Sequence, residues 1–81
     1  MAGRTIFVGG LAEQTTIEAL RAMLSQFGAI EDARLFRRSA SPDDRGFAYV
    51  TFHSSDAAMH ARRLLNGVEF QGARLRVDYA R

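Results

Sequence analysis

The 81-residue sequence contains no cysteine, no lysine and no tryptophan, and it has a single proline. Without cysteine the chain can form neither a disulfide framework nor a zinc finger, and it has no thiol nucleophile. The two histidines, His53 and His60, are too far apart in sequence for one helical face to present both to a metal. We therefore expect no metal site, no cofactor and no catalytic residue.

Long apolar segments are also missing. No run approaches the roughly 18 residues that a membrane span needs, and Met1-Ala2-Gly3-Arg4 lacks the apolar segment of a signal peptide. At 9.0 kDa the chain is enough for one domain, which we expect over residues 4–81. We expect an intracellular monomer that does not contact membranes, in the nucleus or the cytoplasm.

The charge balance is mildly positive. The formal net charge is only +2 although the pI is about 9.9, because all eleven basic residues are arginines. The planar guanidinium group stacks on rings and pairs with phosphate through two hydrogen bonds, which suits an anionic, aromatic partner. A bias of genome composition toward arginine is the alternative explanation.

The hydrophobic pattern alternates between strand and helix periods. Thr15-Thr16-Ile17-Glu18 has the form of a capping box with Thr15 as N-cap. The predicted elements are a strand at 4–11, a helix from this cap to Gly28, strands at 30–36 and 46–53, a helix from Ser54-Ser55-Asp56 to Asn66-Gly67, and a strand at 74–79. This βαββαβ order predicts an α+β, ferredoxin-like sandwich, with a four-stranded antiparallel sheet and two helices on one face.

Aromatic residues stand where the solvent face of such a sheet is normally polar. Along residues 46–53, alternation places Ala48, Val50 and Phe52 on one face and Phe47, Tyr49 and Thr51 on the other. Phe7 likewise points away from its neighbours Ile6 and Val8. Exposed rings suit a flat ligand, and a nucleobase stacked on a ring gains about 1–3 kcal/mol. The alternative, in which both faces are buried, needs a second cover that 81 residues do not supply.

The strands carry a family resemblance. Arg45-Gly46-Phe47-Ala48-Tyr49-Val50-Thr51-Phe52 matches the octamer motif of the RNA recognition motif family at every defined position, and Ile6-Phe7-Val8-Gly9-Gly10-Leu11 is similar to its hexamer motif. The chain resembles this family from about residue 4 to residue 81. The resemblance implies a module that binds single-stranded RNA, or single-stranded DNA, on the open face of its sheet.

The same resemblance implies roles for individual residues. Phe7 and Tyr49 resemble the rings on which successive bases stack, and Phe47 is similar to the ring that packs between two riboses. Arg45 resembles the basic residue that pairs with a backbone phosphate. The stretch that reads base edges is matched by Arg76, Asp78, Ala80 and Arg81.

Further contacts follow from strand alternation. Arg34 and Phe36 are predicted to face outward on the second strand, where Phe36 either adds a stacking platform or packs against the following loop. Arg37 and Arg38 are candidates for phosphate contacts, or are simply solvated. On the second helix, either the stem of Arg62 lies along the edge of the core with its guanidinium in water, or the helix is rotated and Leu64 is buried.

Other functions of this fold fit less well. A phosphate-cleaving enzyme would need an arginine after the first strand, where Gly9-Gly10-Leu11-Ala12-Glu13 has none, so we expect no enzyme. The main alternative is a protein-interaction module that binds a peptide or another domain through its helical face. Such modules usually have degraded octamer aromatics and an Arg-x-Phe motif, whereas this chain keeps the aromatics and has Val68-Glu69-Phe70.

Overall fold

The computed structural model of the chain describes residues 3–37 and 46–80. Its elements are β1 (Thr5–Leu11), α1 (Ile17–Leu24), a 3₁₀ turn η1 (Ser25–Phe27), β2 (Ile30–Phe36), β3 (Gly46–Phe52), α2 (Ser55–Leu65), β4 (Glu69–Phe70), β5 (Ala73–Arg74) and β6 (Arg76–Tyr79). The main elements agree with the sequence prediction, and each predicted strand end lies within two residues of the observed one.

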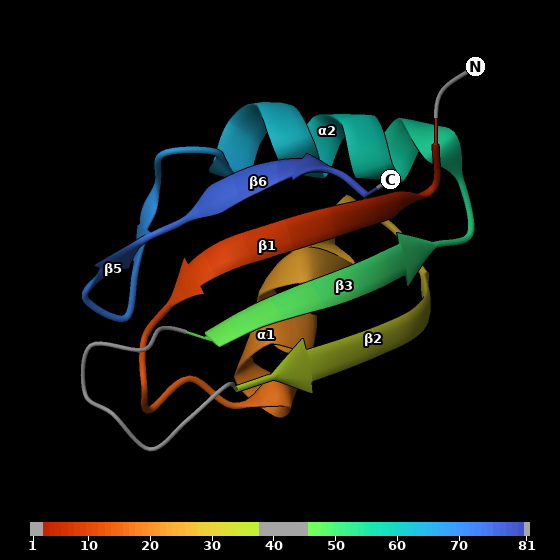
Figure 1. Cartoon of the computed structure of the whole chain (residues 1–81). Helices are drawn as coiled ribbons and strands as arrows, with labels where there is room; N and C mark the ends of the chain where they lie inside the picture. Colours follow the sequence, from red (N-terminus) through yellow and green to blue (C-terminus); the bar gives the residue numbers. More distant parts are fainter. Residues whose placement is uncertain (1–2, 38–45, 81) are drawn as a thin grey trace.

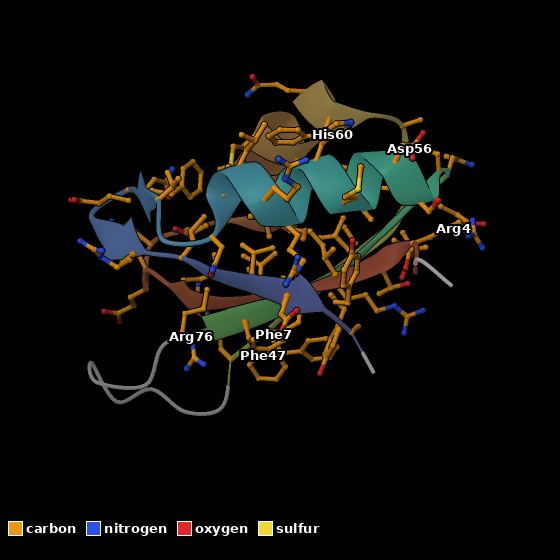
Figure 2. All side chains as sticks on the ribbon, turned by 90° about the horizontal axis from the view of Figure 1, so that it is seen from above. Arg4, Phe7, Phe47, Asp56, His60 and Arg76 are labelled. Atoms are coloured by element: carbon orange, nitrogen blue, oxygen red, sulfur yellow. The ribbon has the colours of Figure 1, made fainter. Side chains whose placement is uncertain are left out.

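A four-stranded antiparallel sheet forms one layer of the fold. Its strand order is β2-β3-β1-β6. Figure 1 shows α1 and α2 on the same side of this sheet, and the view in Figure 2, turned by 90°, shows the helices and the sheet as two layers. The predicted α+β ferredoxin-like architecture is therefore confirmed, and one sheet face lies opposite the helices. We call this the open face.

A small hairpin precedes the last strand and was not predicted. β4 and β5 pair with each other in a separate two-stranded sheet. Gln71 and Gly72, the two residues between them, both have positive φ, at 53° and 85°. Two successive left-handed residues are the signature of a tight hairpin turn whose twist matches the flanking strands. The segment after α2 thus forms a hydrogen-bonded hairpin before the chain enters β6 at the edge of the sheet.

The start of α1 corrects the sequence prediction by one residue. The N-cap is Thr16, whose hydroxyl oxygen accepts a hydrogen bond from the backbone N–H of Ala19 at 3.1 Å. Thr15 is buried and donates its hydroxyl to the Gln71 side-chain oxygen at 2.7 Å. Both threonines are residues favoured at an N-cap, although only Thr15 has the capping-box glutamate, and the distant contact with Gln71 occupies the hydroxyl of Thr15.

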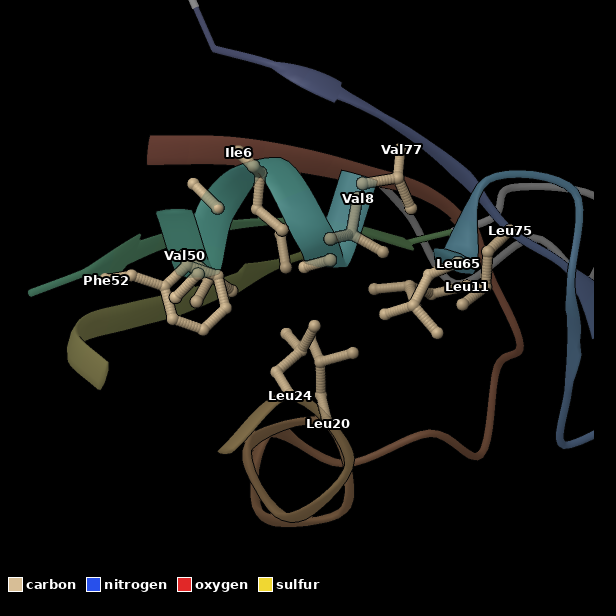
Figure 3. Close-up of a cluster of buried hydrophobic side chains, with 14 residues drawn as sticks. Ile6, Val8, Leu11, Leu20, Leu24, Val50, Phe52, Leu65, Leu75 and Val77 are labelled. Carbon is tan, nitrogen blue, oxygen red and sulfur yellow. The ribbon is translucent and has the colours of Figure 1, made fainter. Parts of the chain in front are cut away.

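The hydrophobic core lies between the sheet and the two helices (Figure 3). Its members are Ile6, Val8, Leu11, Leu20, Leu24, Ala48, Val50, Phe52, Ala57, Ala58, Ala61, Leu65, Leu75 and Val77. The predicted alternation is confirmed along β1 and β3, because Ile6, Val8, Ala48, Val50 and Phe52 are in this list and Phe7, Phe47 and Tyr49 are not. The aromatic residues of the octamer other than Phe52 are therefore left for the open face.

Gly10 marks a close approach of β1 to the hairpin. The pairing of β1 with β3 is irregular between Val8 and Leu11, and Gly10 has φ 72°. A Cβ atom at this position would lie 2.6 Å from the backbone carbonyl oxygen of Arg74. Any side chain would combine an unfavourable backbone conformation with a steric clash, so glycine sets the distance between β1 and the hairpin.

Candidate nucleic-acid interface

Four aromatic rings gather on the open face. Phe7 from β1, Phe36 from β2, and Phe47 and Tyr49 from β3 form what we call the aromatic patch. Phe36 stacks on Phe47 with ring centroids 5.3 Å apart and planes inclined by 21°. The other four contacting pairs have centroids 5.7–6.1 Å apart. Figure 2 shows Phe7 and Phe47 projecting on the side of the sheet away from the helices.

Strand register brings these rings together. Phe7 is directly opposite Tyr49, and Phe36 is opposite Phe47. Opposed residues in an antiparallel pair have Cβ atoms about 4.5–5.5 Å apart, close enough for rings to touch. Phe36 is 41% exposed and Tyr49 39% exposed, which is unusual for such large apolar groups in contact with one another. The patch therefore presents ring surface to solvent.

Gly9 provides room for one of these rings. A Cβ atom at Gly9 would lie 2.8 Å from Cε1 of Phe7, closer than carbon atoms can pack. Gly9 follows Phe7 by two residues in β1, so it lies on the same face of the sheet. The ring of Phe7 consequently lies over the backbone at Gly9 and leans along the strand.

The charged residues predicted for the site have different surroundings. Arg34 and Arg76 are both exposed on the open face. Nε of Arg34 lies 3.1 Å from Oδ2 of Asp32, so part of its charge is offset within β2. Among the described residues, no acidic group lies within ion-pair distance of Arg76. Of these two described arginines beside the patch, Arg76 therefore has the less neutralised charge.

Asp78 and Ala80 lie at the end of the sheet nearest the C-terminus. Asp78 pairs in register with Phe7 of β1, and the Ala80 N–H donates to the Thr5 carbonyl at 3.0 Å. Three further predicted residues, Arg38, Arg45 and Arg81, lie outside the described residues. The described part of the predicted site therefore forms one continuous surface across β2, β3, β1 and β6.

Arg37 links the end of β2 to the connection between β1 and α1. Its Nη2 donates hydrogen bonds to the carbonyl oxygens of Ala12, at 3.2 Å, and Thr15. This part of the guanidinium therefore has a structural role that the sequence did not predict. A phosphate contact by Arg37 stays a prediction.

A groove next to the patch was missed from the sequence. It has a volume of about 560 Å³ and is lined by Phe7 and Tyr49 of the patch, Arg62 of α2, Asn66 at the C-cap of α2, and residues 76–80. We call it the β6 groove. Sequence reasoning singled out Arg62 but placed its guanidinium in water. The alternative with a buried Leu64 is wrong, because Leu64 is 62% exposed.

The guanidinium of Arg62 is held on two sides. Its Nε lies 3.1 Å from Oδ1 of Asp78, and its central carbon lies 5.0 Å from the centroid of the Tyr79 ring. Both distances are typical of an ion pair and of a cation–π contact. Arg62 thus connects the helical layer to the edge of the sheet. The residue type at this position did not by itself predict these contacts.

Other kinds of site are not seen in the part of the chain that the structure describes. Within residues 3–37 and 46–80 there is no group of three or more histidine, aspartate or glutamate residues able to hold a metal ion. In the same residues, none of the helices has the length and apolar character required to cross a membrane.

Comparison with known proteins agrees with this geometry. Among curated proteins, the chain is 39% identical to glycine-rich RNA-binding protein 5, mitochondrial, of Arabidopsis thaliana over 99% of its own length and 27% of that protein's. The chain spans about a quarter of the length of the curated relatives it matches.

Solved structures show the same fold. The Mip6 RRM3 domain superimposes with a TM-score of 0.90 at 23% identity, covering 100% of this chain and 96% of that one. The Rna15 RRM with bound RNA (GU) gives a TM-score of 0.83 at 20% identity, covering 96% and 83%. The model of the RNA recognition motif family matches residues 6–76. The chain belongs to the RNA recognition motif family.

Proposed function

We propose that this chain binds single-stranded RNA across the open face of its sheet. The observation that carries the proposal is the aromatic patch, in which four rings meet on a face that no described element covers. Unpaired bases are flat and expose both faces, so they stack on such rings. Family membership, the RNA-binding relative and the RNA-bound structural neighbour support the same conclusion.

Individual roles follow from position and from the family pattern. Phe7 and Tyr49 stack two successive bases, Phe47 packs against the riboses between them, and Phe36 extends the stacking surface. Arg34 and Arg76 contribute positive charge at opposite edges of the patch. Base edges are read by Arg76, Asp78, Ala80 and Arg81, and a backbone phosphate pairs with Arg45. Arg45 and Arg81 lie outside the described residues, so their roles are inferred from the sequence motif.

The expected affinity is modest. Two or three stacked bases contribute about 2–9 kcal/mol before the cost of ordering the strand is subtracted. The upper end of that range leads to micromolar dissociation constants, which we expect for two to four nucleotides. The isolated domain is expected to bind as a monomer.

Titration of the ¹⁵N-labelled chain with a short single-stranded RNA tests the proposal. Amide signals of β1 and β3 at the patch should shift in fast exchange, whereas those of the outer surfaces of α1 and α2 should not. A DNA oligonucleotide of the same sequence distinguishes recognition of the ribose 2′-hydroxyl from stacking alone. If RNA leaves the patch signals unchanged while a peptide library shifts those of the helices, the chain is instead a protein-interaction module.

Salt dependence provides a second measurement. Few cations flank the patch, and Arg34 is already paired with Asp32. About four phosphate contacts at about −0.7 each predict a slope of log K against log salt no steeper than about −3. Binding isotherms between low and physiological salt measure this slope. A slope near −6 would contradict the assignment, because it requires many more phosphate contacts than the patch provides.

A further inference from the structure

The outer edge of β6 is closed to backbone pairing by two side chains. The Val77 N–H donates to Oδ1 of Asn66 at 3.0 Å, and the Tyr79 N–H donates to Oδ1 of Asp78 at 2.8 Å. A peptide that extends a sheet must find free N–H and C=O groups along the edge strand. Because both of these N–H groups are satisfied, an added β-strand is a poor occupant of the β6 groove.

Arg62 and Asn66 offer hydrogen-bond donors to the groove. The oxygen of the Asn66 amide is taken by Val77, which leaves its Nδ2 as the donor end. Arg62 uses Nε for Asp78 and one face of its guanidinium for Tyr79, and its two terminal nitrogens remain. The Oδ1 atom of Asp78 accepts from both Arg62 and Tyr79. A ligand that meets Arg62 and Asn66 must therefore present acceptors to them.

The charge of the β6 groove and its position beside the aromatic patch favour a nucleotide as its ligand. Arg62 and Arg76 against Asp78 give the groove one net positive charge, which suits an anion. Its volume of about 560 Å³ lies within the range of about 300–1,000 Å³ that is typical of small-ligand sites. Phe7 and Tyr49 belong to both the aromatic patch and the groove lining. A strand stacked on the patch can therefore continue into the groove without crossing a gap.

We propose that the β6 groove binds the nucleotide flanking those on the aromatic patch, and that Arg62 and Asn66 select a guanine or uracil there. Guanine presents two adjacent acceptors, O6 and N7, and uracil presents O4. At the ring position where guanine has O6 and uracil O4, adenine and cytosine have an exocyclic amine, which would meet the donors of Arg62 and Asn66. The proposal rests on RNA binding by the patch, and it extends the footprint from the sheet onto α2.

The test compares two pools of five-nucleotide RNAs with the same central trinucleotide. The two outer nucleotides are guanine or uracil in one pool, and adenine or cytosine in the other. The wild-type chain should bind the first pool about fivefold more tightly, the low end of what a specific base contact provides. The side-chain signals of Arg62 Nε–H and Asn66 Nδ2 should shift with the first pool and not with the central trinucleotide alone.

Two variants and a matched control test whether Arg62 and Asn66 produce this base preference. Arg62→Met keeps an unbranched stem over Tyr79, removes the donors, and should reduce the preference to less than about twofold. Asn66→Asp keeps the acceptor for Val77 but replaces the donor, and should shift the preference toward adenine and cytosine. Arg63→Met removes the same charge from the neighbouring, exposed position on α2 and should leave the preference unchanged.

The outcomes separate this inference from the proposed function. If RNA shifts the patch signals but the two pools bind equally, RNA binding stands and the groove assignment is overturned. Retention of the preference by Arg62→Met, or its equal loss in Arg63→Met, also overturns the assignment. If no RNA shifts the patch signals, the proposed function itself fails.

Discussion

Replacing Tyr49 by alanine is expected to weaken RNA binding by about 1–3 kcal/mol without unfolding the domain. The ring is 39% exposed and lies on the open face, so its removal takes away a stacking platform and leaves the core intact. The same loss is expected for Phe7→Ala, whose ring centroid lies 5.7 Å from that of Tyr49. Isothermal titration or fluorescence anisotropy with one short RNA measures both losses.

Two controls make this result specific to stacking. Tyr49→Phe keeps the ring and should retain most of the affinity, because stacking does not need the hydroxyl. Leu64→Ala removes a more exposed apolar side chain from α2, at 62%, and should leave the affinity unchanged. Because Phe7 and Tyr49 touch, their combined loss need not equal the sum of the single losses. Unchanged RNA affinity in both single alanine variants would contradict the proposed site.

Which side chains of a strand point to the core was predictable, because it depends on alternation along the strand itself. Along β3, one residue in two points to the core, and the small or branched residues Ala48 and Val50 could lie under the helices while Tyr49 lay outside. The same alternation placed Phe36 outward on β2. It left open whether Phe36 packs on the loop or adds a stacking platform. Its stack on Phe47 makes it part of the patch, and the loop after Arg37 lies outside the described residues. That contact depends on strand register, which no single strand reveals.

Features that depend on contacts distant in sequence were not predictable. Thr15 is followed three residues later by the glutamate of a capping box, yet its hydroxyl binds Gln71, more than fifty residues away, and Thr16 is the N-cap. Arg37 is likewise fixed by carbonyl groups over twenty residues earlier. In each case the local sequence allows several partners for one polar group, and tertiary packing selects among them.

The β6 groove belongs to this second class. The sequence predicts for Arg62 only a stem along the edge of the core, with its guanidinium in water. Its meaning depends on Asp78 and Tyr79, which reach it only after the chain has turned through the hairpin of β4 and β5. The hairpin itself rests on Gln71 and Gly72, whose positive φ angles were not anticipated. The connection after α2 thus determines how helix and sheet edge share one surface.

Mutations on the core face of β3, opposite the aromatic patch, are expected to lower stability and not primarily RNA binding. Phe52 is fully buried between the sheet and the helices (Figure 3), and Phe52→Ala should lower the free energy of unfolding by about 3–5 kcal/mol through the cavity it leaves. A domain of this size has about 4–12 kcal/mol in total, so the variant is close to unfolding. Denaturant titration followed by circular dichroism measures the loss.

Comparison of Phe52→Ala with Tyr49→Ala then tests the two faces of β3 against each other. The side chains are three positions apart, so they point to opposite faces of the strand, and both are large aromatic groups. Tyr49→Ala should change the unfolding free energy by well under the 3–5 kcal/mol expected at Phe52, because its ring leaves no internal cavity. If Tyr49→Ala unfolds the domain while Phe52→Ala remains stable, the two faces are assigned the wrong way round. The aromatic patch would then be core, and no surface would remain on which bases stack.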